Sequence, residues 1–202
     1  LPSLKKLSET IKSEGALAIL QIFHAGRMAL PDEIPGGQPI SASAVAAERP
    51  GAVIPKEMTE AEIQEIIKAF GETTKLAIEA GFDGVEIHGA NTYLLQQFIS
   101  PHSNRREDFW GGSRDKRRNF PLAVIAEVKK AVKENGSEDF IIGYRFSPEE
   151  LENPCITLED TLSFVDILAD QELSYLHVSL MNFGQSSIRD TKETTPVIHK
   201  LL

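Results

Sequence analysis

The 202-residue sequence contains a single cysteine, Cys155, so no disulfide can form within the chain. It has no apolar run near the roughly 20 residues of a membrane-spanning helix. Basic residues are also few, 21 against 30 acidic ones, which gives a net charge of −9. Nucleic acids and anionic membranes repel such a surface, so we expect neither as a partner. The lone thiol and the absence of an amino-terminal signal pattern predict a cytoplasmic location.

The sequence also lacks the glycine-rich fingerprint of dinucleotide-binding sheets. It contains instead an alternation of helical and strand-like segments. Four short apolar runs are typical of buried strands: residues 16–23, 83–88, 140–146 and 175–179. The first of them, being almost continuously apolar, is expected to be covered on both faces. Strands separated by helices predict parallel pairing with right-handed crossovers.

Two α/β architectures fit this order, an open doubly wound sheet and a TIM (β/α)8 barrel. The missing fingerprint favours the barrel. A complete barrel has eight strands and typically about 250 residues. Residues 1–202 are therefore predicted to form a single partial barrel domain with about four of the eight strands, and with a long loop at residues 30–58.

Local signals mark several helix boundaries. Thr59 followed by Glu62 is a capping box that opens a helix, and Gly81 ends this helix. Thr157 is placed to cap a later one. Pro121 interrupts a helical pattern near residues 114–134, which predicts a kink or a late start there.

Two segments show no sustained helical or strand-like spacing of apolar residues. Residues 30–58 are rich in Pro, Gly, Ala and Ser, and are too long for an ordinary connector. They are either a functional loop or a partly disordered segment. Residues 100–116 carry charges of both signs, and we interpret them as a salt-bridged loop that braces the barrel rim in preference to a phosphate site.

Polar side chains capable of chemistry gather at the ends of the predicted strands. These are Gln21, His24 and Arg27, then His88, Asn91 and Tyr93, then Arg145, and last His177. In a parallel barrel, the carboxyl ends of all strands open to one mouth, where barrel enzymes keep their chemistry. His88 and Asn91 can both donate hydrogen bonds to one oxygen, and Tyr93 can deliver a proton nearby.

Four linked segments resemble the Old Yellow Enzyme family. Residues 21–27 (QIFHAGR) are similar to its Q-x-x-H-A-G-R segment, and residues 88–98 (HGANTYLLQQF) to its H-G-A-x-x-Y-L-x-x-Q-F segment. Residues 100–113 resemble the S-P-x-x-N-x-R…G-G-S continuation. Residues 143–147 (GYRFS) resemble the strand with a flavin-contacting arginine. The match runs in register from about residue 16 to 179.

The resemblance implies an FMN-dependent oxidoreductase that uses NADH or NADPH to reduce activated C=C bonds of small α,β-unsaturated carbonyl compounds, such as enones and enals. His88 and Asn91 would stabilise the negative charge that develops on the carbonyl oxygen. Tyr93 would protonate the α-carbon. Gln21, Arg145 and His88 would contact the flavin, and the permanent charge of Arg145 would favour its reduced form.

Several side chains also have a purely structural interpretation. For His24 and Arg27 we prefer that interpretation, because their motif position can serve to hold a loop. His177 is expected to pack within its strand. Glu86 alternates with His88 and should point into the barrel, where its charge needs a partner such as a cation from a neighbouring strand. Arg145 has an alternative partner in an acidic neighbour, Glu149 or Glu150.

Two alternative functions stay open. In a metal-dependent barrel hydrolase, His24, His88 and His177 can share a zinc ion. Against it, the sequence has no His-x-His on a strand and no carboxylate at a strand end, so we predict no metal site. The other alternative is a catalytically incomplete barrel fragment, predicted to bind FMN weakly or not at all by itself, because the phosphate normally lies after strands seven and eight. The physiological substrate and the oligomeric state, including a homo-oligomer, are not specified by the sequence.

Overall fold

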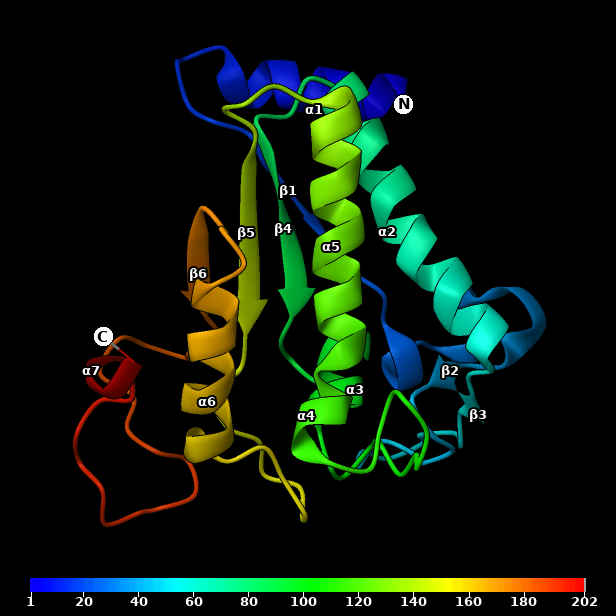
Figure 1. The fold of residues 1–202 in the computed structure, drawn as a ribbon, viewed down its shortest axis with the longest axis vertical. Coiled ribbons are helices and arrows are strands. Elements are labelled where there is room, and N and C mark those ends of the chain that lie inside the picture. The colour runs from blue at the N-terminus through cyan, green and yellow to red at the C-terminus, as the bar shows by residue number, and fades with distance from the viewer. Residues whose placement is uncertain (202) are drawn as a thin grey trace.

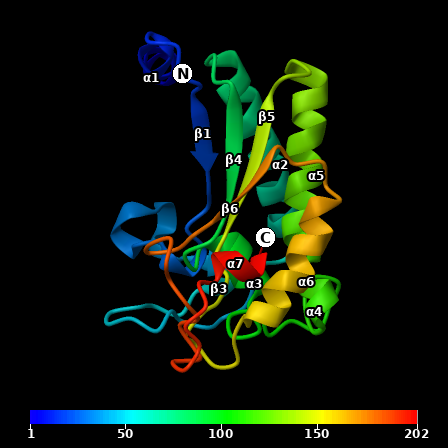
Figure 2. The same ribbon diagram turned by 90° about the vertical axis from the view of Figure 1, so that its left-hand side faces the viewer.

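The fold, seen here in a computed structural model that describes residues 1–201, is built on a four-stranded parallel sheet of order β1-β4-β5-β6. The strands are β1 (Ile19–Ile22), β4 (Gly84–Gly89), β5 (Ile141–Phe146) and β6 (Tyr175–Val178). Three helices lie on one face of the sheet: α2 (Glu60–Glu79), α5 (Asn119–Asn135) and α6 (Leu158–Ala169) (Figure 1). Figure 2 shows this two-layer arrangement from the side. The predicted α/β order of four parallel strands is confirmed.

The remaining elements lie at the two ends of the strands. Helix α1 (Pro2–Lys12) crosses the end at which the strands begin (Figure 1). The other end carries α3 (Leu94–Ile99), α4 (Arg114–Arg117) and α7 (Ile198–Leu201), with the 3-10 turns η1 (Gly26–Met28), η2 (Pro31–Glu33) and η3 (Pro35–Gly37) and the short strands β2 (Ile40–Ser41) and β3 (Lys56–Glu57). Within residues 1–201, no helix combines the length and apolar character needed to cross a membrane.

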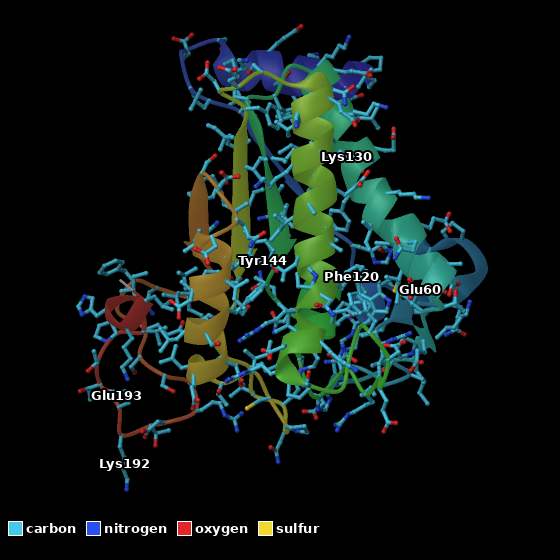
Figure 3. All side chains as sticks on the ribbon, viewed as in Figure 1. Glu60, Phe120, Lys130, Tyr144, Lys192 and Glu193 are labelled. Atoms are coloured by element: carbon cyan, nitrogen blue, oxygen red, sulfur yellow. The ribbon has the colours of Figure 1, made fainter. Side chains whose placement is uncertain are left out.

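The core lies between the sheet and its helices. Alternate strand residues point toward the helices, and Val85, Ile87 and Tyr144 are completely buried there. Burying each side chain of this size contributes about 1.5–3 kcal/mol. Tyr144 and Phe120, both labelled in Figure 3, belong to this layer. Gly89 makes room for Tyr144, because a Cβ there would fall 2.2 Å from the tyrosine hydroxyl.

The opposite face of the sheet, called the inner face below, is not covered by a helix of residues 1–201. The expectation that the first strand is covered on both faces is therefore wrong. Gln21 of β1 is exposed, and its neighbours Ile19 and Leu20 are only partly buried. The apolar run indicated burial, but among residues 1–201 β1 pairs with β4 alone and is covered by helices on one side only.

The predicted helix signals are confirmed. Thr59 and Glu62 form a complete capping box at the start of α2, and Thr157 with Asp160 forms another at α6. The pattern over residues 114–134 is divided into α4 and α5, and Pro121 lies in the first turn of α5. A proline is tolerated in a first turn because its missing N–H has no partner there.

The two segments without a period are ordered at the carboxyl end of the sheet. Within residues 30–58, β2 and β3 form a small parallel pair. Strands of two residues are too short to produce a periodic pattern, so the sequence did not indicate them. The interpretation of residues 100–116 as a salt-bridged brace is confirmed: Arg106 pairs with Asp108 at 2.5 Å and Arg114 with Asp160 at 3.3 Å.

Arg106 is the central residue of this brace, and its replacement by alanine tests the interpretation. Its buried Nη1 donates to the carbonyl oxygens of Ala42 (3.0 Å) and Met58 (2.7 Å), which adjoin β2 and β3. We expect Arg106→Ala to lower the free energy of unfolding by about 2–3 kcal/mol, because buried acceptors lose their donor. Urea denaturation measures this. The exposed Arg105→Ala is the matched control, with about 0.5 kcal/mol or less, and equal losses in both variants would contradict the role of Arg106.

Candidate active site

The register of the sheet places the predicted polar residues on the inner face. His88 of β4 pairs with Arg145 of β5, which pairs with His177 of β6. Register partners on parallel strands point to the same side. One layer below, Gln21 pairs with Glu86. The strand register therefore brings together, toward the carboxyl end of the strands, side chains that are far apart along the chain.

His88 is buried, and its tautomer follows from its hydrogen bonds. The backbone N–H of Ala90 donates to His88 Nδ1 at 3.2 Å. Nδ1 is then the acceptor nitrogen of the neutral ring, and Nε2 carries the proton. Burial, together with the positive charge of Arg145, lowers the pKa of His88 to about 4. His88 therefore presents a neutral N–H donor at physiological pH.

Tyr93 lies beside His88. Its ring meets the imidazole edge-on, with 5.1 Å between centroids, and its other neighbour is Phe23 at 5.0 Å. The connecting turn is tightly defined, since Asn91 and Thr92 both have left-handed backbone angles, with φ of 56° and 61°. Such strain persists only where the surroundings hold it, and it gathers at functional sites. No residue in the described part of the chain accepts a hydrogen bond from the Tyr93 hydroxyl, which leaves it available to a bound molecule.

Asn91 is tied to two later segments. Its backbone N–H donates to Ser147 Oγ at 2.9 Å, just after β5. Its side-chain Oδ1 accepts a hydrogen bond from Ser179 Oγ at 2.8 Å, just after β6. Ser179 Oγ in turn accepts a hydrogen bond from Arg145 Nη2 at 3.0 Å. The sequence did not indicate a role for either serine, because serines after strands are too common to predict a functional site.

Arg145 is not neutralised by the acidic residues that follow its strand. Glu149 accepts hydrogen bonds from Ser187 (2.8 Å) and from the backbone of Ile188. Glu150 is buried and bonds to other residues, Gln96, Ser100 and the backbone of Ile156. Arg145 Nε is itself buried without a partner among the described residues. The alternative pairing of Arg145 with Glu149 or Glu150 is therefore wrong, and its charge remains available at the inner face.

The comparison with known proteins gives the family. The model of the "NADH:flavin oxidoreductase / NADH oxidase family" matches residues 1–199. The chain belongs to this family. It is 54% identical over 200 residues to an NADH:acrylate oxidoreductase of Vibrio harveyi, covering 99% of the chain and 20% of that protein.

Two further relatives of the oxidoreductase family extend the comparison. A probable NADH-dependent flavin oxidoreductase of Bacillus subtilis is 49% identical over 194 residues, with 96% of this chain and 52% of that protein covered. The solved structure of morphinone reductase superposes with a TM-score of 0.77 at 28% identity, over 92% of this chain and 53% of the other. The chain thus spans about half, or less, of the relatives it matches. The barrel prediction is confirmed, with four of its strands present here.

Gln21 and Glu86 lie one layer below His88, and the side chain of His177 reaches Glu86 from the His88 layer. Gln21 Nε2 donates to Glu86 Oε1 at 2.5 Å, and His177 Nδ1 lies 2.9 Å from Glu86 Oε2. Burial opposes ionisation of Glu86, but hydrogen bonds from Gln21, His177 and Tyr175 outweigh it and lower its pKa. Glu86 points inward as predicted, with an amide and an imidazole as partners. The expectation that His177 packs is wrong: its side chain is 44% exposed, because no helix of residues 1–201 covers the inner face.

The side chains of His24 and Arg27 bond to groups of nearby loops, which agrees with the structural interpretation of both residues. Arg27 is buried and donates to the carbonyl oxygens of Val45 and Ala46 while pairing with Glu152 at 3.3 Å. His24 Nδ1 accepts from the backbone of Gly26 at 3.0 Å. Both hydrogen-bond sets hold loops at the barrel rim.

The shared-zinc arrangement receives no support from the geometry. In the part of the chain that the structure describes, no group of three or more His, Cys, Asp or Glu residues is placed to hold a metal ion. His24 bonds to its own loop, and His177 bonds to Glu86.

Proposed function

We propose that this chain supplies the substrate-activating residues of an FMN-dependent oxidoreductase, which uses NADH or NADPH to reduce the activated C=C bond of a small α,β-unsaturated carbonyl compound. The observation that carries the proposal is the shared position of His88, Tyr93 and Arg145 on the inner face, with Arg145 unneutralised. The acrylate in the name of the Vibrio harveyi relative is itself an α,β-unsaturated acid, which supports this substrate class.

The inner face suits an isoalloxazine ring. Arg145 offers a buried Nε–H without a partner, and a permanent cation stabilises an anionic reduced ring. Gln21 is exposed and bonds Glu86 through one N–H, so its carbonyl oxygen and second N–H match a ring edge with both donors and acceptors. Gln21, Arg145 and His88 would hold the flavin. When bound, FMN supplies the hydride that no side chain can provide.

The side chains of the chain then have distinct tasks. The Nε2–H of His88 and the amide of Asn91 bind the carbonyl oxygen, and both bonds strengthen as negative charge develops on it. Once the β-carbon had gained a hydride and the electrons of the C=C bond had shifted toward the oxygen, Tyr93 would donate its proton to the α-carbon. The product is the saturated carbonyl compound, with one hydride and one proton added. Water then returns the proton to Tyr93.

A turnover experiment tests the proposal. The full-length protein that carries this chain is loaded with FMN, reduced anaerobically with NADH or NADPH, and mixed with 2-cyclohexenone or with cyclohexanone as a saturated control. We expect loss of the flavin absorption on reduction, its return with cyclohexenone alone, and one equivalent of cyclohexanone formed. If no enone, enal or unsaturated acid reoxidises the flavin, the proposal fails. Stoichiometric zinc without flavin would support the hydrolase instead.

A further inference from the structure

We propose that Ser179 is a positioning residue that determines which end of the Asn91 carboxamide faces the substrate. The inference rests on the proposed function of Asn91 as a donor to the carbonyl oxygen. It concerns a residue after β6 that lies 88 positions from Asn91 in the sequence.

Two hydrogen bonds meet at the Ser179 hydroxyl, and their directions support this role. Arg145 Nη2 lies 3.0 Å from Ser179 Oγ, and Ser179 Oγ lies 2.8 Å from Asn91 Oδ1. A guanidinium has donors only, so the serine oxygen must accept from Arg145. The single hydroxyl hydrogen is then free to point at Asn91. In the structure it does so, and Asn91 Oδ1 accepts it.

The direction of this hydrogen bond determines the orientation of the Asn91 carboxamide, which is otherwise ambiguous. A carboxamide is nearly symmetric in shape, and its two ends differ only in donating or accepting. Asn91 is exposed, and its backbone is held separately by Ser147 at 2.9 Å and by a left-handed φ of 56°. The main remaining freedom is the 180° flip of the amide. With Oδ1 held by Ser179, the Nδ2 hydrogens point away from the serine hydroxyl.

The flip matters for the proposed chemistry. Nδ2 presented to the carbonyl oxygen donates a hydrogen bond that stabilises the developing charge. The flipped amide would present Oδ1, whose lone pairs repel that charge. The relay also connects the predicted flavin contact, Arg145, with the predicted carbonyl-binding group, Asn91. Arg145 orients the hydroxyl of Ser179, and this hydroxyl orients the amide of Asn91.

The kinetic test uses the FMN-loaded full-length protein with 2-cyclohexenone as the probe. We expect Ser179→Ala to lower kcat/KM about 3- to 10-fold, the usual value of one hydrogen bond, and to add little in an Asn91→Ala background. Ser179→Thr and Ser179→Val have the same shape and differ by the hydroxyl, so threonine should retain activity that valine loses. Ser137→Ala, at an exposed serine before the amino end of β5, is the control and should match the unmodified protein.

A second readout is independent of turnover. In ¹⁵N-labelled protein, the side-chain NH₂ signals of Asn91 are assigned by their disappearance in Asn91→Ala. We expect one sharp pair in the unmodified protein and in Ser179→Thr, and a shifted or broadened pair in Ser179→Val, where the amide is free to flip. This comparison holds even if Ser179→Ala fails to fold.

The outcomes distinguish a failure of the Ser179 role from a failure of the proposed function. If Asn91→Ala reduces kcat/KM but Ser179→Val leaves both the kinetics and the Asn91 signals unchanged, the role of Ser179 is wrong and the proposed function stands. If Asn91→Ala itself has no effect on enone reduction, the assignment of Asn91 as a donor fails, and the inference with it.

Discussion

Replacement of Tyr93 by phenylalanine is expected to slow the reduction of an α,β-unsaturated ketone by about 10²–10⁴-fold, the usual contribution of a positioned acid. The phenylalanine ring keeps the packing against His88 and Phe23, whose centroids lie 5.1 and 5.0 Å away. Only the hydroxyl is lost. Rapid mixing of the reduced protein with 2-cyclohexenone under anaerobic conditions measures the effect on flavin reoxidation.

The Tyr93→Phe result has a clear internal control. Flavin content should be unchanged, because Tyr93 is not among the residues that would hold FMN. The solvent isotope effect on reoxidation should also change, since the proton then comes from water. A variant that reoxidises at the unmodified rate would show that Tyr93 only packs against its neighbours, and the acid would have to be sought elsewhere on the inner face.

Replacement of His88 by alanine is expected to lower the rate of the same step by about 10²–10³-fold, as found when one donor to a developing oxyanion is removed. His88 Nε2 is the donor because Nδ1 accepts from Ala90 at 3.2 Å. His88→Asn retains a side-chain donor and should recover part of the rate. The exposed His199→Ala is the matched control and should be unaffected.

The same histidine has a consequence for pH. Its folded-state pKa is lowered to about 4, whereas an unfolded histidine titrates near its model value of 6.5. As pH falls from 6.5 to 4, the unfolded chain binds a proton that the folded chain does not, so stability falls across this window. Thermal denaturation should show that the unmodified protein loses stability relative to His88→Asn over this range. Parallel pH curves would contradict a neutral buried His88.

Much of the fold could be predicted because its signals are local. The capping boxes at Thr59 and Thr157 need only residues three positions apart. The four apolar runs gave the four strands, and the alternation with helices gave their parallel order. The β2–β3 pair was not predicted, because strands of only two residues are too short to show an alternating apolar pattern.

The core of the candidate site was also accessible from local sequence. His88, Asn91 and Tyr93 occupy a single strand end and turn, and even the tautomer of His88 depends on a backbone N–H two residues later. Gln21 and Arg145 were reached through the family resemblance of their strands. Their placement on one face then follows from parallel pairing and the two-residue side-chain alternation of strands.

The amino-acid sequence by itself determined the strands, the helix starts, the family and the polar turn that follows β4, because each depends on neighbours along the chain. Only the tertiary structure decided that Arg145 does not pair with Glu149 or Glu150, since these two carboxylates bond to distant partners. It also decided that His177 is exposed, and that Arg145, Ser179 and Asn91 form one directed relay across separations of 34 and 88 residues. The direction of a hydrogen bond depends on which groups meet in space, and a periodic pattern in the sequence does not predict such long-range contacts.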